Sequence, residues 1–81
     1  MKIVNNEVRV TLEELGELEV ILGTPPSFSV NEFHFWADTR LDELAAEGNS
    51  LMGDIAALML YEIFPNLITP SERPISLRNS H

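Results

Sequence analysis

The sequence predicts a mainly α-helical fold, namely a compact three-helix domain with a short N-terminal β-hairpin or strand and an extended, proline-containing C-terminal tail. Two amphipathic segments each follow a capping-box sequence, and a third, more apolar segment ends at a proline. A length of 81 residues corresponds to one domain. We place the hairpin and the helices in residues 1–64 and the tail in residues 65–81. Hydrophobic residues make up 44% of the chain, which is too high a fraction for a disordered protein.

Residues 2–10 are predicted to form the β-hairpin. Asn5 and Asn6 tolerate the positive φ angles of a two-residue turn, and apolar residues alternate with polar ones after them. This turn places Ile3 opposite Val8. Two strands this short need support from the helices. A single strand that leads directly into the first helix is the alternative.

The first helix is predicted over residues 12–22. Thr11 and Glu14 have the spacing of a capping box, and Gly23 followed by two prolines ends the helix. Gly16 lies in the middle of the helix, where glycine costs about 1 kcal/mol relative to alanine. We therefore expect another backbone to approach closely at this position. The leucines that form one stripe are Leu12, Leu15, Leu18 and Leu22.

The second helix begins after Ser29, which has Glu32 at the capping-box spacing, and ends near Gly48. Phe35 and Trp36 project away from its apolar stripe and lie among polar residues. Exposed aromatic side chains are enriched at the hot spots of protein interfaces, so both residues are candidates for partner binding. The alternative is that the hairpin or the tail covers them. The stripe itself consists of Val30, Phe33, Ala37, Leu41 and Leu44.

The third helix, from about Leu51 to Phe64 before Pro65, is apolar on almost every side. Such a helix is normally buried on every side, and three helices and a hairpin are too few to enclose it. We therefore expect a partner protein or a second copy of the chain to cover the remainder. The candidate contact residues are two small ones that allow close approach and two adaptable methionines: Gly53, Ala57, Met52 and Met59.

The net charge of −8, from 13 acidic and five basic residues, disfavours direct binding to nucleic acid or to an anionic membrane surface. It favours a partner with a basic protein surface, although charge can also serve solubility alone. The acidity belongs to residues 1–64. Two pairs of acids at i, i+4 spacing share helix faces and are the candidate charged contacts: Glu13 with Glu17, and Asp38 with Asp42.

No arrangement typical of catalysis, metal binding or cofactor binding is present in the sequence. There is no cysteine, the two histidines are far apart in sequence, and the glycines do not form a phosphate-binding loop. His34 precedes Asp38 by one helical turn but lacks a nucleophile beside it. The longest apolar run, Ile55 to Tyr61, is too short to span a bilayer, and no targeting segment is evident. We expect a cytoplasmic protein that is not an enzyme.

The leading functional hypothesis is a homodimeric, non-enzymatic protein-interaction module that acts as a small regulator or assembly factor through its second and third helices. The alternative is an acidic decoy or inhibitor that occupies the basic groove of a nucleic-acid-binding protein, in the manner of phage counter-defence proteins. That comparison is an analogy of charge and size. A third hypothesis, an enzyme that uses glutamate or aspartate, requires a concave pocket with a carboxylate of raised pKa.

Overall fold

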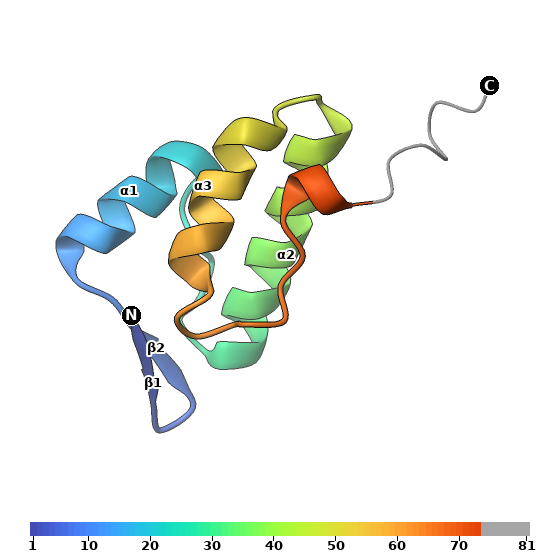
Figure 1. Cartoon of the computed structure of the whole chain (residues 1–81). Coiled ribbons are helices and arrows are strands. Elements are labelled where there is room, and N and C mark those ends of the chain that lie inside the picture. Colours follow the sequence, from blue (N-terminus) through green and yellow to red (C-terminus); the bar gives the residue numbers. More distant parts are fainter. Residues whose placement is uncertain (74–81) are drawn as a thin grey trace.

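The computed structural model describes residues 1–73, in which a two-stranded hairpin precedes three α-helices (Figure 1). The mainly α-helical fold expected from the sequence is confirmed. Residues 74–81, which include the second half of the expected tail, lie outside the described residues. The elements in chain order are β1 (Lys2–Val4), β2 (Glu7–Arg9), α1 (Leu12–Leu22), α2 (Val30–Ala46), α3 (Ser50–Leu60) and the short 3-10 helix η1 (Pro70–Glu72).

The hairpin has the register that the sequence predicts, with Ile3 opposite Val8 in an antiparallel pair. Asn5 and Asn6 adopt φ angles of 52° and 65°, the left-handed conformation that a two-residue turn requires. On the other edge of β2, the Val8 N–H donates a hydrogen bond of 2.8 Å to the Phe28 carbonyl. The hairpin is therefore attached to the segment that leads into α2.

The first two helices begin and end where their capping residues place them. The Thr11 hydroxyl accepts a hydrogen bond from the Glu14 N–H, and the Glu14 carboxylate accepts one from the Thr11 N–H, which completes the capping box of α1. The Ser29 hydroxyl caps α2 by accepting from the Glu32 N–H. Gly23 and Gly48 follow the two helices with positive φ angles of 86° and 78°.

α3 ends at Leu60, four residues earlier than the sequence predicts. The chain then turns, and the Phe64 N–H donates to the Leu60 carbonyl at 2.8 Å. Pro65 disfavours a helical conformation of Phe64, because the proline ring clashes with the residue before it. The turn directs the buried Phe64 ring toward Phe33, with 6.3 Å between the ring centroids. The aromatic contact thus replaces the last helical turn.

The hydrophobic core lies where the three helices meet. Phe33 is fully buried at its centre and packs edge-to-face on Trp36, with 5.1 Å between the ring centroids. The hairpin contributes Val8 and the C-terminal segment contributes Leu67. The other large side chains that are fully buried in this core are Leu18, Leu22, Leu41 and Leu60.

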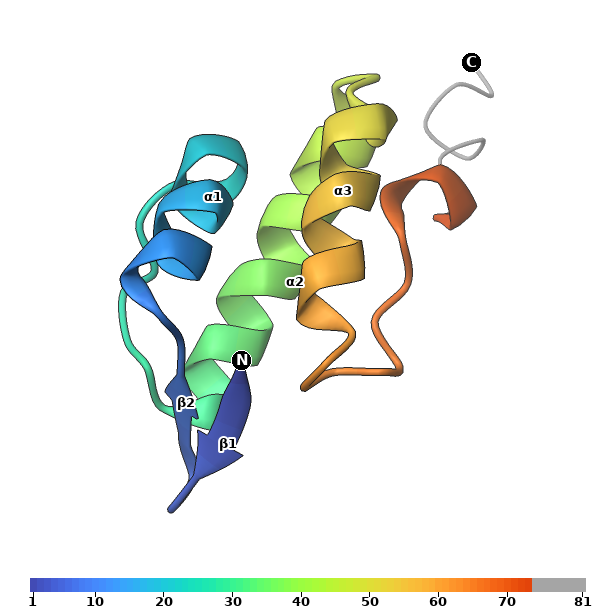
Figure 2. The same ribbon diagram turned by 60° about the vertical axis from the view of Figure 1, so that its left-hand side comes forward.

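Residues 65–73 pack on α2 and α3 (Figure 2). Their backbone is irregular, as expected for the tail, apart from η1, but Leu67 and Pro70 are buried. Pro70 lies directly over Gly53, where an added Cβ atom would be 2.4 Å from the Pro70 Cγ. Arg73 donates a hydrogen bond of 3.0 Å to Asp38 on α2. The first half of the tail is therefore part of the folded body.

Candidate functional site

The outward face of α3 carries large apolar side chains that the chain leaves in contact with solvent. Only the small residues and Leu60 on the inward face are buried. Leu51, Ile55 and Leu58 have exposed fractions of 76%, 46% and 64%. Their i, i+4, i+7 spacing places them on one helix face. The apolar excess that the sequence assigns to this helix is therefore present in the folded chain.

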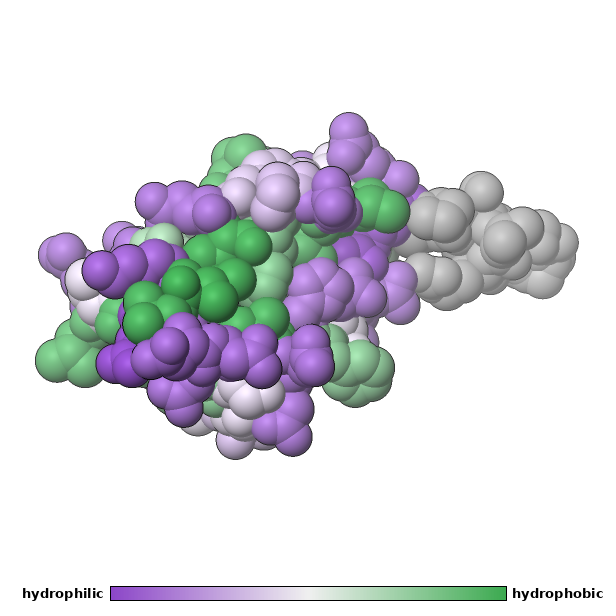
Figure 3. Space-filling model, turned by 90° about the horizontal axis from the view of Figure 1, so that it is seen from below, coloured by the Kyte–Doolittle hydropathy of each residue, from purple (hydrophilic) through white to green (hydrophobic). Residues whose placement is uncertain are grey.

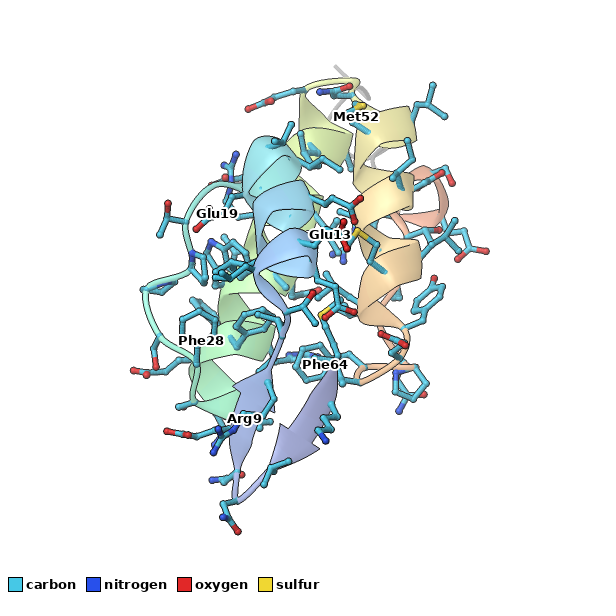
Figure 4. The ribbon with its side chains drawn as sticks, turned by 90° about the vertical axis from the view of Figure 1, so that its left-hand side faces the viewer. Arg9, Glu13, Glu19, Phe28, Met52 and Phe64 are labelled. Atoms are coloured by element: carbon cyan, nitrogen blue, oxygen red, sulfur yellow. The ribbon has the colours of Figure 1, made fainter. Side chains whose placement is uncertain are left out.

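A groove of about 390 Å³ runs between α1 and α3 and adjoins this face. The two helices lie side by side, with the Glu13 side chain projecting toward α3 and Met52 near the start of α3 (Figure 4). We call the groove and the outward face of α3 together the α1–α3 surface. Contiguous apolar patches of this kind mark interaction sites on soluble proteins. The apolar residues of the α1–α3 surface are Val20, Ile21, Leu51, Met52, Ile55, Leu58 and Met59.

Other apolar side chains are also exposed, and the view from below shows an apolar area bordered by hydrophilic residues (Figure 3). The exposed large apolar residues outside the α1–α3 surface come from the hairpin, the start of α1, the loop before α2, the outer face of α2 and the C-terminal segment. Scattered exposed apolar residues are normal for a soluble protein. The α1–α3 surface differs because its residues come from two adjacent helices and line one groove. Among residues 1–73, the remaining exposed large apolar residues are Ile3, Leu12, Phe28, Phe35 and Ile68.

Carboxylates border the α1–α3 surface on both sides. Glu17 lines the groove, and Glu13 lies one helical turn away on α1. Among residues 1–73, no cation pairs with either of them. Asp54 lies on the opposite side of α3 and accepts a hydrogen bond of 3.0 Å from the Ser71 N–H. Glu62 lies beyond the C-terminal end of α3 and pairs with the Met1 amino group, so the bordering carboxylates without a cationic partner among residues 1–73 lie on the two sides of the surface.

The α-amino group of Met1 connects α1 to the turn that follows α3. It donates hydrogen bonds of 3.0 Å to Glu14 on α1 and 2.7 Å to Glu62. The bonds to Glu62 and then Glu14 raise the pKa of this amino group above its ordinary value of 8.0. The pKa of Glu14 is lowered, first by the hydrogen bond from the Thr11 backbone and then by the amino group. The chain start thus fixes one end of α1 relative to the end of α3.

The structure brings together part of the contact set expected from the sequence. Met52, Met59 and Glu17 line the groove. Gly53 and Ala57 are buried, so the expectation that a partner helix approaches them is wrong. The close approach at Gly53 is made by Pro70 of the same chain.

The sequence left open whether Trp36 is exposed or covered, and the structure buries it, with only 9% of this residue exposed. The buried face of α2 is wider than the stripe counted from the sequence, and it includes Trp36 beside Phe33. Phe35 is 72% exposed, as expected, but it lies on the outer face of α2 and does not line the groove. The two aromatic residues therefore do not form one contact site.

Asp38 and Asp42 face the C-terminal segment. Arg73, whose side chain is only 8% exposed, pairs with them through N–O distances of 3.0 and 4.0 Å. This acidic pair therefore neutralises a cation of the same chain, whereas Glu13 and Glu17 border the groove. The expected neighbour of Asp38, His34, packs edge-on against the Phe64 ring with 4.8 Å between centroids.

The expectation for Gly16 is not met either. An added Cβ atom at this position would have no neighbour within 4 Å, so no backbone approaches it. Sequence reasoning missed Val20 and Ile21 as members of the α1–α3 surface. The available signal was that both are apolar and lie outside the leucine stripe of α1.

Within the described part of the chain, no group of three or more potential metal ligands comes together. No helix among these residues combines the length and the hydrophobicity that crossing a bilayer requires. Comparisons of the chain with protein-family models, curated proteins and solved structures gave no match.

Proposed function

We propose that this protein is a non-enzymatic protein-interaction module, a small regulator or assembly factor that binds another protein through the α1–α3 surface. The observation that carries the proposal is the exposure of Leu51, Ile55 and Leu58 on one face of α3. Covering side chains of this size gains about 1–2 kcal/mol each when they are already partly buried. Association through the whole surface is therefore favourable by several kcal/mol before its entropic cost.

An acidic decoy for the basic groove of a nucleic-acid-binding protein is the second candidate. The observation that favours it is the unpaired state of Glu13 and Glu17 in a chain of net charge −8. The pairing of Asp38 and Asp42 with Arg73 weakens it, because half of the expected acidic contacts are directed at the chain itself. We therefore rank apolar association first and steering by charge second.

The test compares two exposed apolar positions on different helices. Leu58→Ser removes a residue of the α1–α3 surface, and Phe35→Ser removes one of similar exposure outside it. Both variants should keep the circular dichroism spectrum and Tm of the parent chain, because neither side chain is in the core. Capture of partners from an extract of the native cells should fall at least about tenfold for Leu58→Ser and stay unchanged for Phe35→Ser, with quantitative mass spectrometry as the measurement.

Capture by Leu58→Ser at the parent level would contradict the proposal. The salt dependence distinguishes the two candidates in the same experiment. A decoy held by charge loses its partner steeply between about 50 and 200 mM salt. A module held by apolar burial retains most of its partner over that range, because hydrophobic association is not screened.

A further inference from the structure

We infer that the partner segment recognised by the α1–α3 surface is an amphipathic helix whose apolar face is bordered on both sides by lysine or arginine. This inference rests on the proposed function and specifies the partner. It follows from three properties of the surface, which are its shape, its length and the charges along its edges.

The shape of the site is the space between two neighbouring helices. A groove between helices accepts the side chains of a third helix, which project from one face at i, i+3, i+4 and i+7. Met52 and Met59 line this groove, and their flexible side chains adapt to different apolar partners. No sheet edge borders the groove, so an added β-strand has no backbone hydrogen bonds to make there.

The length of the surface sets the length of its occupant. Leu51 and Leu58 are seven residues apart on α3, which corresponds to about 10 Å along the helix axis. A partner helix that covers both ends therefore needs about three turns, or about 11 residues. Such a short helix is marginal alone in water, so the partner segment either folds on binding or belongs to a larger fold.

The charges along the edges decide which kind of apolar helix binds. Glu13 and Glu17 repel each other at i, i+4 spacing, and among residues 1–73 they have no cationic partner. Asp54 adds negative charge on the opposite side. A partner with basic margins relieves this repulsion, whereas one with acidic margins adds to it. The surface therefore selects basic over acidic helices with the same apolar face.

A second copy of this chain fits the surface less well. A twofold dimer through the α1–α3 surface would place the Glu13 and Glu17 edge of each copy against an acidic edge of the other copy, either the same edge or the Asp54 edge, depending on the direction of the twofold axis. Within residues 1–73, the three arginines are each paired with acids of their own chain outside the surface: Arg9 with Glu7, Arg40 with Glu43, and Arg73 with Asp38. The remaining cationic side chain of these residues, Lys2, lies on β1, outside the surface. The homodimer expected from the sequence is therefore a competing outcome of the test.

The experiment measures fluorescence anisotropy of two labelled synthetic helical peptides with the full chain. The peptides share one apolar face and differ in having lysine or glutamate on its margins. We expect the lysine peptide to bind at least tenfold more tightly. Glu17→Lys should remove this preference, whereas Glu19→Lys should preserve it. Glu19 is the matched control because it lies on the same helix and points away from the groove (Figure 4).

Each outcome decides the inference separately from the proposed function. Equal binding of the two peptides, or an equal effect of the Glu17 and Glu19 variants, would overturn the charge selection. A failure of both peptides to bind would overturn the helix as occupant. If light scattering then gave a dimer that Leu58→Ser dissociates, the second copy would be the occupant. In all these cases the loss of cellular partners by Leu58→Ser tests the proposed function independently.

Discussion

Two glycines in the middle of helices provide a test of how the C-terminal segment is held. Gly16 on α1 and Gly53 on α3 each cost helix stability relative to alanine. A Cβ atom at position 16 would have no neighbour within 4 Å. At position 53 it would lie 2.4 Å from the Cγ and 3.2 Å from the Cβ of Pro70. The same substitution therefore has opposite consequences at the two positions.

Gly16→Ala should raise the free energy of unfolding by about 1 kcal/mol, the difference in helix propensity. In a domain of this size the increase corresponds to a rise in Tm of about 4–8 °C. Gly53→Ala gains the same propensity but must displace Pro70, and overpacking of this kind costs about 1–3 kcal/mol. The net effect is a loss of up to about 2 kcal/mol.

Urea unfolding followed by circular dichroism measures both free energies. Combining Gly53→Ala with Pro70→Ala, which removes the clashing Cγ atom, should recover part of the loss. Hydrogen exchange at the Arg73 amide, which donates to the Pro70 carbonyl, reports whether the segment has detached. An equal gain in stability from the two single alanine substitutions would refute the packing of Pro70 on α3.

Four further results are expected. Trp36→Ala should lower the free energy of unfolding by about 3–5 kcal/mol, because it removes a buried ring from the core. A variant with the urea stability of the parent chain would contradict the burial of Trp36. Arg73→Gln should speed amide exchange in residues 67–73 while the global free energy of unfolding falls by less than about 1 kcal/mol, since Asp38 is half exposed. Because folding raises the pKa of the Met1 amino group, the charged amino group stabilises the fold fully below pH 8.0, and this stabilisation is lost as the pH rises through the pKa of the folded state. Nα-acetylation should therefore abolish the decrease in urea stability at alkaline pH. The lowered pKa of Glu14 gives the opposite dependence, with stability lost as the pH falls below 4.5.

Local signals in the sequence were sufficient for most of the fold. Asn5 and Asn6 specify the hairpin turn, and the capping residues Thr11 and Ser29 specify where α1 and α2 begin. These features depend on backbone conformation within a few residues, so they are visible without knowledge of tertiary contacts. The end of α3 was missed because it depends on a contact between Phe64 and Phe33.

The site was predicted only in part, because exposure depends on which distant segments pack on a helix. The outward face of α3 was evident from its excess of apolar residues. Pro70 covers Gly53, and Arg73 pairs with Asp38. Both contacts depend on how residues 65–73 fold back onto α2 and α3, and no local sequence pattern predicts this packing. The exposure of Trp36 could not be decided from the sequence for a related reason, since the width of the buried face of α2 is set by its neighbours.

The α1–α3 surface is uncovered in the folded chain, and we propose that another polypeptide covers it. This coverage is tested with a photo-crosslinking amino acid at position 58, introduced into the chain in its native cells, with position 35 as the exposed control. We expect a discrete covalent adduct with a second polypeptide from position 58 and none from position 35. Irradiation that yields no adduct from position 58, or the same adducts from both positions, would contradict the proposal.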